Sequence, residues 1–328
     1  MRVRIASKHI PLLATAAVLI TLYLGGCLAY SNFFSLRVLV ALFGDNAFLG
    51  IAAVGATFVI LSGGIDLSVG SLVAFTSTLI AVLVQRGVHP LAAIGLALAC
   101  GSLFGAGMGA LIQRYRLPSF LVTLAGMFLA RGLGFVVHPQ SLGIKHPFYL
   151  ETVARDLALP LGGRLHLPFT ASCFVLTLAA GLYLAHHTRF GRAVYALGDD
   201  SEAANLMGLP VARTRIAVYT LAGLCSALAG VVFTFYTQSG NPASCVGFEL
   251  DAIAAVVIGG TLLSGGVGFV GGTAMGVLIL GLIQSLITFH GTLNTWWTRI
   301  AVGLLLLFFL ALQNVVVAAS RRRAASVQ

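Results

Sequence analysis

The residues of this sequence best suited to chemistry are acids that stand beside glycines within long apolar runs. The first lies in I-L-S-G-G-I-D-L-S-V-G, residues 60–70, where Asp66 follows Gly63 and Gly64. Lipid offers no partner to a charge, so an ionisable group at membrane depth faces the protein interior or a water-filled path. Irregular backbone at that depth is also tolerated only where protein or a cavity covers it. The stretch therefore predicts a helix break in a functional part of a membrane protein.

Three interpretations of Asp66 stay open from the residues alone. Its carboxylate could cap the helix that begins near Leu67, and Ser68 is also a capping type. It could instead line the path of a solute, or it could relay protons. No His or Lys stands close to Asp66 in the sequence, which weakens the proton-relay interpretation.

A second stretch has the same ingredients. Residues 247–258, G-F-E-L-D-A-I-A-A-V-V-I, carry Glu249 and Asp251 ahead of an apolar run that Gly259 and Gly260 interrupt. Asp251 has the same alternatives as Asp66, whereas Glu249 is expected at the water interface. Short, glycine-broken segments at corresponding places of two halves indicate a transport site. The residues predicted for the translocation path or its helix breaks are Gly63, Gly64, Asp66, Ser68, Glu249, Asp251, Gly259 and Gly260.

The composition agrees with a membrane protein. Hydrophobic residues make up 59% of the 328 residues and charged residues 9%, whereas a soluble protein has roughly 25% charged residues. The formal charge of +10 comes mostly from short segments between apolar runs, where Lys and Arg set topology and do not form a nucleic-acid surface. The five cysteines lack metal-ligand spacing, so we predict small apolar roles for them, with no metal site and no cofactor.

Ten apolar runs predict an all-α integral membrane protein with about ten transmembrane helices. They cover approximately residues 10–30, 38–61, 68–84, 90–112, 119–137, 167–185, 216–236, 249–263, 270–289 and 297–318. The first run lacks a small-residue cleavage site and is expected to be a span, not a removable signal peptide. Basic residues before it and after the last run place both termini in the cytoplasm.

The fourth run resembles the ninth. Gly101, Gly105 and Gly109 recur 167 residues later as Gly268, Gly272 and Gly276, with Met and Leu also matched between them. Runs that are five spans apart cross in opposite directions, which predicts one permease domain over residues 1–328 with a 5+5 inverted repeat, about 10–137 and 167–318. Small residues every four positions are also ordinary helix packing, and we expect close helix contacts at Gly105, Gly109, Gly272 and Gly276.

The polar loop of residues 186–215 contains a short predicted helix, about residues 201–207. Ser201 is its expected N-cap, and Gly208 with Pro210 is its expected stop. A helix of two turns is not stable alone in water, so it needs a docking surface on this chain or on a partner. The alternative is a loop that only joins two spans.

Enzyme chemistry finds no support. The sequence has no H-E-x-x-H and no G-x-S-x-G, and neither of its two lysines stands in a Walker A loop. The chain is therefore expected to be no enzyme, and any ATP hydrolysis would be done by a partner subunit.

Four motifs, in this order, resemble the ribose-type sugar permeases of bacterial ABC importers. They are G-G-I-D-L-S-V-G at 63–70, T-R-F-G-R at 188–192, A-L-G-D-D-S-E-A-A-N-L-M-G at 196–208 and E-L-D-A-I-A-A-V-V-I-G-G at 249–260. Within that family, D-N-A-F-L-G at 45–50, Y-T-Q at 236–238 and G-G-T-L-L-S-G-G-V-G at 259–268 are most similar to a permease subunit of the galactofuranose importer.

The resemblance implies a permease of the bacterial inner membrane that translocates a monosaccharide. Its implied partners are cytoplasmic ATP-binding subunits, a second permease subunit that is identical or homologous, and a periplasmic sugar-binding protein, besides membrane lipid and without nucleic acid. It also implies that residues 196–208 couple to the ATPase. The alternative class is a stand-alone secondary transporter of a small polar solute.

The family resemblance assigns the coupling role to Gly191, Ala196, Gly198, Glu202, Ala203, Ala204 and Gly208. The chain departs from the family pattern at Asp199–Asp200 and at Leu209–Pro210, which puts individual contacts in doubt and not the role of the loop.

Overall fold

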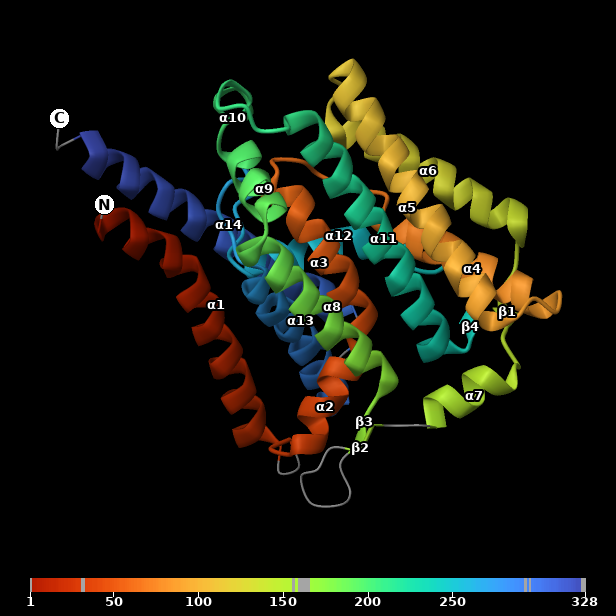
Figure 1. Ribbon diagram of the computed structural model, residues 1–328. Helices are drawn as coiled ribbons and strands as arrows, with labels where there is room; N and C mark the ends of the chain where they lie inside the picture. The colour runs from red at the N-terminus through yellow and green to blue at the C-terminus, as the bar shows by residue number, and fades with distance from the viewer. Residues whose placement is uncertain are drawn as a thin grey trace.

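The computed structural model describes residues 2–30, 33–154, 157–158, 166–291, 294 and 296–325 (Figure 1). The first half contains α1 (Arg2–Ala29), α2 (Leu36–Asp45), α3 (Ala47–Leu61), α4 (Val69–Gln85), α5 (Pro90–Tyr115), α6 (Ser119–Val137) and α7 (Pro147–Ala154). The second half contains α8 (Phe169–His187), α9 (Arg189–Asp199), α10 (Ser201–Leu206), α11 (Val211–Thr237), α12 (Phe248–Ile258), α13 (Val270–His290) and α14 (Trp296–Ala325). Two short antiparallel pairs join β1 (Leu142–Gly143) to β4 (Ser239–Gly240) and β2 (Leu157–Ala158) to β3 (His166–Leu167).

Seven helices in the described chain are long and apolar enough to cross a membrane. They lie at Pro11–Ala29, Pro90–Tyr115, Ser119–Val137, Phe169–His187, Val211–Thr237, Val270–His290 and Trp296–Val315. The pair α2 and α3, bent by 59° at Asn46, gives an eighth if it is one span. The prediction of a helical multi-pass membrane protein is therefore confirmed.

The difference from ten spans comes from two of the predicted runs. The run at residues 68–84 is α4, which has 17 residues, and the run at 249–263 is α12, which ends at Ile258 after 11 residues. Helix α4 follows the irregular segment 62–68, and α12 follows Gly247 in the left-handed conformation. A glycine-bearing break precedes each helix; α4 is at the lower limit of spanning length, whereas α12 is too short to span by itself.

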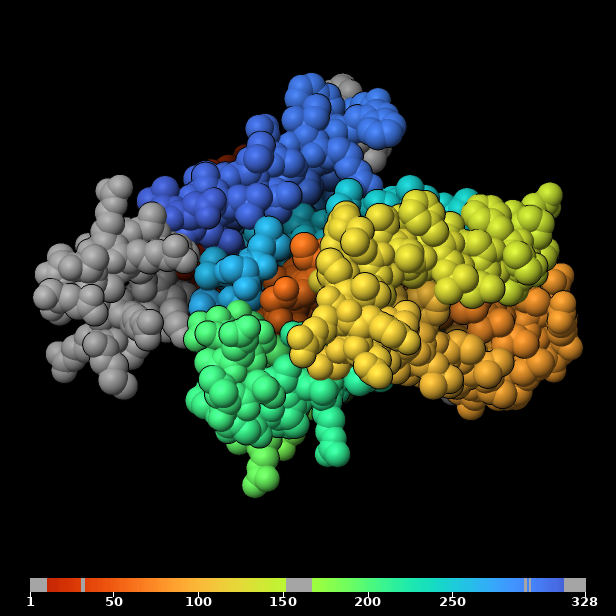
Figure 2. Space-filling view, turned by 90° about the horizontal axis from the view of Figure 1, so that it is seen from above, coloured from red at the N-terminus to blue at the C-terminus, as the bar shows by residue number. Residues whose placement is uncertain are grey.

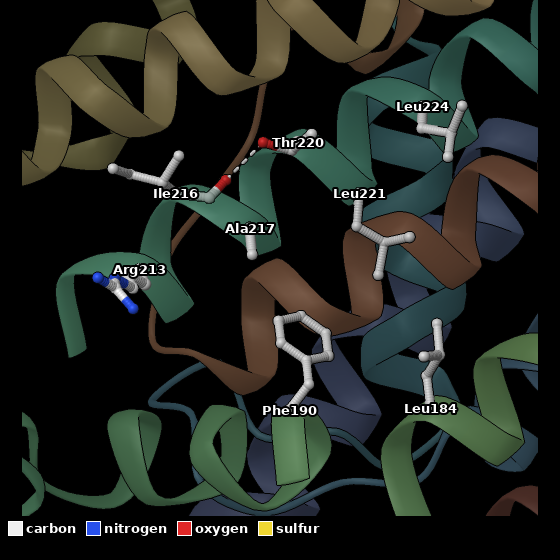
Figure 3. Close-up of a pocket in the computed structure, with 8 residues that line it drawn as sticks. All are labelled: Leu184, Phe190, Arg213, Ile216, Ala217, Thr220, Leu221 and Leu224. Carbon is white, nitrogen blue, oxygen red and sulfur yellow. Dashed lines mark hydrogen bonds between the residues drawn. The ribbon is translucent and has the colours of Figure 1, made fainter. Parts of the chain in front are cut away.

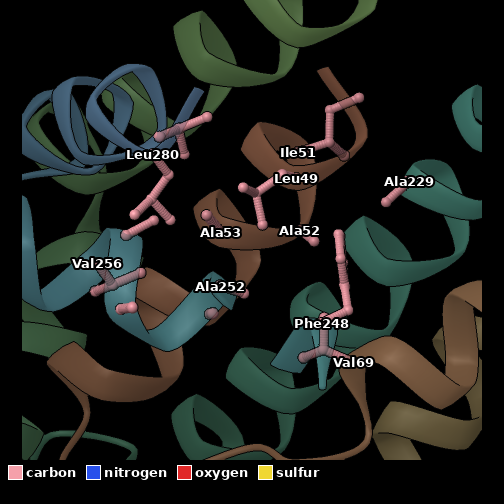
Figure 4. Packing of buried hydrophobic residues seen from close by; sticks show 14 of the residues in the cluster. Leu49, Ile51, Ala52, Ala53, Val69, Ala229, Phe248, Ala252, Val256 and Leu280 are labelled. Atoms are coloured by element: carbon pink, nitrogen blue, oxygen red, sulfur yellow. The ribbon is translucent and has the colours of Figure 1, made fainter. Parts of the chain in front are cut away.

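Helix α3 forms the centre of the protein. Phe48 is its one residue that is not buried, and the helix packs against α11, α8, α12 and α13. Figure 4 shows Leu49 and Ala53 of α3 on the side of Val256 and Leu280 of neighbouring helices. A helix that is apolar on every side is buried on every side, which explains the unbroken apolar sequence of α3.

The outer helices are apolar on a face that has no protein neighbour. Leu103 of α5, Phe128 of α6 and Leu304 of α14 are each more than half exposed. In a soluble protein such a surface would be costly, but in a bilayer it faces lipid. These helices therefore form the lipid-facing side of the protein.

The glycines of the predicted repeat do make close helix contacts. A methyl group on Gly105 would lie on the Tyr219 carbonyl oxygen of α11, and one on Gly276 would lie on the Ala255 carbonyl oxygen of α12. Such small residues let two backbones approach closely in a membrane. The α5 glycines contact α11, and the α13 glycines contact α12. In an exact 5+5 correspondence, the α13 glycines would contact α3 instead.

Gly109 and Gly272 show the same difference between the contacts of α5 and those of α13. Gly109 lies against Ile216 of α11, and Gly272 lies against the carbonyl of Gly259, the residue that follows α12. Helix α13 still contacts α3 through a hydrogen bond of 2.8 Å between the Thr57 and Thr273 hydroxyls.

Candidate translocation and coupling site

The two short helices begin side by side. Gly70, in the first turn of α4, lies against the first turn of α12, where an added Cβ would sit 2.6 Å from the Cys245 carbonyl oxygen and 3.2 Å from Phe248 Cβ. The same Cβ would also meet the Glu249 carboxylate. These helices are the third and eighth predicted runs, which are the counterparts in a 5+5 repeat. Their positive N-terminal ends converge, as in transporters with discontinuous helices.

Asp66 lies in the extended segment that leads into α4. Its side chain is 3% exposed, and Oδ1 accepts hydrogen bonds from the Ser68 amide at 2.8 Å and the Ser68 hydroxyl at 2.7 Å. Ser68 is the N-cap of α4, and its own side chain makes no cap hydrogen bond. The geometry is that of a local turn before α4, in which Asp66 bonds the N-cap residue Ser68 and does not itself take the cap position, so the capping interpretation stays a prediction. A role of its charge in a solute path stays a prediction.

Helix α6 holds this extended segment in place. The Ile65 amide donates to the Ser119 hydroxyl at 3.2 Å, and the Thr123 hydroxyl donates to the Ile65 carbonyl at 3.2 Å. Backbone groups that no helix satisfies thereby find side-chain partners, as irregular backbone at membrane depth requires.

Glu249 is enclosed at one carboxylate oxygen. Its Oε2 atom is buried and has no hydrogen-bond partner among the described residues. The side chain as a whole is partly exposed, and its neighbour Leu250 is 60% exposed, so the expected place of Glu249 at the water interface stays a prediction. A carboxylate beside two helix N-termini is electrostatically favoured there, and a role of Glu249 in a solute path stays a prediction.

Arg131 belongs to this site, although the sequence analysis did not single it out. From the middle of α6 it donates to the Pro242 carbonyl at 2.7 Å, the Ser244 carbonyl at 2.5 Å and the Cys245 carbonyl at 3.3 Å. It thus clamps the loop that leads into α12. The sequence did show a charged residue within an apolar run, which is the pattern of a functional residue. It did not show the partner of Arg131, which lies 111 residues later in the chain.

Asp251 forms an ion pair with Arg299 of α14, with 2.7 Å between Arg299 Nη1 and Asp251 Oδ1. Gly247 is the N-cap of α12, so Asp251 in its first turn is tied to another helix and does not occupy the cap position. Both side chains are partly exposed, and an exposed pair of this kind contributes at most about 1 kcal/mol. It connects α12 with α14.

The glycine breaks meet the coupling loop at one point. Gly198, near the end of α9, lies between two of them: a methyl group there would lie on the Leu61 carbonyl oxygen and 2.5 Å from the Gly266 nitrogen. The Gly266 amide donates to the Leu61 carbonyl at 3.0 Å, which joins the end of α3 to the loop before α13. Gly63 with φ of 78° and Gly265 with φ of 86° allow the turns that make this approach possible. We call this contact the Gly198 junction.

Helix α9, like Arg131, was not predicted by the sequence analysis. It begins at Arg189, with the Thr188 hydroxyl accepting from the Gly191 amide at 3.1 Å. Gly191 packs directly on the Ala185 carbonyl of α8, and Ala196 is half-buried on the same helix. The Tyr195 hydroxyl donates to the Gly268 carbonyl at 2.9 Å, so α9 is attached to the loop before α13 twice.

Helix α10 matches the predicted short helix, with a different cap. Its N-cap is Asp200, whose carboxylate accepts from the Glu202 and Ala203 amides at 2.9 and 3.0 Å, and Ser201 is its first residue. The expectation of Ser201 as N-cap was therefore wrong by one residue, because a carboxylate at 200 competes for the same amides. The helix ends before Gly208, which has a φ of 76°.

The apolar side chains of α10 and of the residue that follows it are partly buried in this chain and partly exposed. Ala204 is buried, whereas Leu206 is 88% exposed and Met207 is 69% exposed. Two large apolar side chains therefore stand exposed at the end of this short helix.

A polar cavity of about 770 Å³ lies between α10 and the break after α3. Figure 2 looks onto this face and shows orange atoms of the segment after α3 at the floor of a hollow between the green, yellow and blue parts of the chain. The cavity wall includes Ser62, Gly64, Ser119, Arg215 and Tyr219. The Tyr219 hydroxyl is buried in this wall, which also contains Ser119.

Residues 38–310 match the family model described as branched-chain amino acid transport system, permease component. The chain is a member of this permease family. It is 50% identical over 308 residues to an inner membrane ABC transporter permease of Escherichia coli strain K12, covering 94% of this chain and 92% of the relative.

Two further relatives carry the name of a sugar. The fructose import permease of Bifidobacterium longum is 36% identical, with 94% of this chain and 91% of the relative covered. The ribose import permease of Escherichia coli strain K12 is 37% identical, with 86% and 87% covered. No solved structure matches this chain significantly. Because the family is the permease component of ABC transporters, its members are not themselves the ATPase.

Proposed function

We propose that this chain is the permease subunit of an ABC importer that translocates a monosaccharide across the bacterial inner membrane. The observation that carries the proposal is the Gly198 junction, where the coupling loop touches both the break after α3 and the loop before α13. A force applied to α9 and α10 would reach the breaks directly. This arrangement suits a transporter driven by a partner that binds on the α10 face.

The proposed partners are cytoplasmic ATP-binding subunits on α10, a second permease subunit and a periplasmic sugar-binding protein. Exposed Leu206 and Met207 support an occupied α10 face. The relatives named for ribose and fructose support a monosaccharide as the solute. The motifs shared with the galactofuranose importer make galactofuranose, or a similar sugar, the proposed substrate.

The proposed topology has ten membrane-crossing segments in a 5+5 inverted repeat, about residues 10–137 and 167–318, with both termini and the loop 186–215 in the cytoplasm. Helices α4 and α12 are its short third and eighth segments, and their converging N-termini support the repeat. Asp66 and Glu249 stand at their starts and are the proposed contacts of the path.

An uptake assay tests the function. The permease would be expressed with its ATPase and binding-protein partners in cells that lack their own sugar importers, and given labelled galactofuranose, galactose, ribose and fructose. We expect uptake of one of them, abolished when the ATPase carries an inactive Walker A lysine. Uptake that survives the inactive ATPase and stops with a proton uncoupler would instead support a stand-alone secondary transporter.

A further inference from the structure

An apolar groove runs along the outside of the protein between α11 and the turn from α8 to α9. It has a volume of about 570 Å³, and its wall includes Leu184, Phe190, Ile216, Ala217 and Leu224 (Figure 3). The one polar uncharged side chain in the wall, Thr220, donates its hydroxyl hydrogen to the Ile216 carbonyl at 2.8 Å. The groove therefore offers almost only hydrocarbon to an occupant.

One end of the groove is charged. Arg213, in the first turn of α11, is its one charged lining residue and is exposed. Arg189 and Arg192 are exposed on α9, the helix that supplies Phe190 to the wall. The charged end lies on the side of the protein that carries α9 and α10 (Figure 1), so the groove begins at a basic surface and continues into the spanning part of α11.

The length of the groove fits one membrane leaflet. Arg213 and Leu224 are eleven residues apart on α11, and this distance is about 16 Å at a rise of about 1.5 Å per residue. Half the hydrocarbon thickness of a bilayer is about 15 Å. A soluble partner on α10 would not reach the inner end of the groove, whereas an acyl chain whose headgroup lies at Arg213 would.

We propose that this groove is a binding site for an anionic phospholipid, with its phosphate at Arg213 and one acyl chain along Ala217 and Leu224. Lipid tails are as apolar as the groove, so the exchange of one lipid for another gives little selectivity by itself. Selectivity comes from the arginine, because a basic residue at the membrane surface favours anionic over zwitterionic headgroups. A lipid held there would touch α9, and through α9 the Gly198 junction.

The test uses the permease assembled with its partner subunits in nanodiscs of equal phosphatidylglycerol and phosphatidylcholine, with the retained lipid measured by native mass spectrometry. We expect a preference for phosphatidylglycerol that falls about fivefold in Arg213→Gln. Ala217→Phe fills the groove and should lower the retention of both lipids. Both positions are outside the core, so assembly should be preserved.

Two variants serve as matched controls. Arg114→Gln removes an exposed arginine in the last turn of α5, and Gly107→Phe places a ring in the α5–α6 groove, where an added Cβ meets nothing within 4 Å. Neither should change the phosphatidylglycerol preference. An unchanged preference in Arg213→Gln, or equal loss in Arg213→Gln and Arg114→Gln, would overturn the site. Retention of free glycerol phosphate at this site as strong as that of the phospholipid would overturn the proposed role of the acyl chain.

Discussion

Gly198 shows how one residue type can decide whether two distant segments meet. No other residue fits between the Leu61 carbonyl and the Gly266 amide, because any Cβ would overlap the backbone on both sides. We expect Gly198→Ala to lower uptake at least tenfold while the permease still inserts, since overpacking costs about 1–3 kcal/mol and acts at one contact. Uptake and membrane protein level are measured together. Gly107→Ala, with open space around its Cβ, is the control, and equal uptake in both variants would show that the junction is not under steric constraint.

Substitutions of Asp66 can test the role of its hydrogen bonds separately from the role of its charge. Asn keeps the oxygen that accepts from the Ser68 amide, whereas Ala removes it. If the residue only fixes the start of α4, Asp66→Asn should keep most of the uptake, and Asp66→Ala should lose about 1 kcal/mol of stability. Thermal unfolding of the purified protein and uptake in vesicles check both. A well-folded Asp66→Asn protein without uptake would instead assign the charge to the solute path.

At the level of elements, the tip of α10 is the exposed part of the proposed coupling device. Replacing Leu206 by Asp removes an apolar side chain that is 88% exposed, so the spans should remain folded. We expect the ATPase subunits to co-purify at least tenfold less and uptake to stop. Leu150→Asp on α7, where the side chain is 53% exposed, is the matched control. Retention of the ATPase by the Leu206→Asp protein would place the docking surface elsewhere.

The elements that the sequence predicted well are those defined by local hydropathy. The runs at residues 119–137 and 270–289 agree with α6 and α13 to within one residue, because the pattern that inserts a helix lies within the helix itself. Glycine pairs also marked the breaks, because they permit turns that other residues disfavour. Hydropathy does not show where a glycine break ends a helix, which is why α12 was expected to continue to residue 263, whereas the predicted run at 68–84 has the same length as α4.

Contacts between distant segments could not be predicted in the same way. The partner of Asp251 is Arg299, 48 residues later, and the carbonyls that Arg131 holds come more than 100 residues after it. Helix α9 was overlooked because it is amphipathic, with polar residues that suit a surface loop equally well. These features depend on how the helices pack, and only the assembled fold shows them.

For the whole molecule, the crossing of α4 and α12 decides the topology. Figure 1 shows both chain ends toward the side that carries α10 and shows α7 toward the opposite side. If α4 completes a crossing, five segments separate the N-terminus from Lys145, and the two lie on opposite sides of the membrane. If α4 does not, four segments separate them, and they lie on the same side. Helix α12 decides in the same manner whether Glu202 and the C-terminus share a side.

Reporter fusions at four positions therefore test the ten-segment topology without a sugar or an ATPase. We expect the N-terminus, Glu202 and the C-terminus to report the cytoplasm and Lys145 to report the periplasm, because α4 and α12 each continue across the membrane through a glycine break. The pair Lys145 and Glu202 is an internal control, since α8 is the one candidate span between them in the described chain. If that pair reports opposite sides while the N-terminus and Lys145 share one, either α4 or the bent pair α2–α3 does not complete a crossing, and the inverted repeat does not hold.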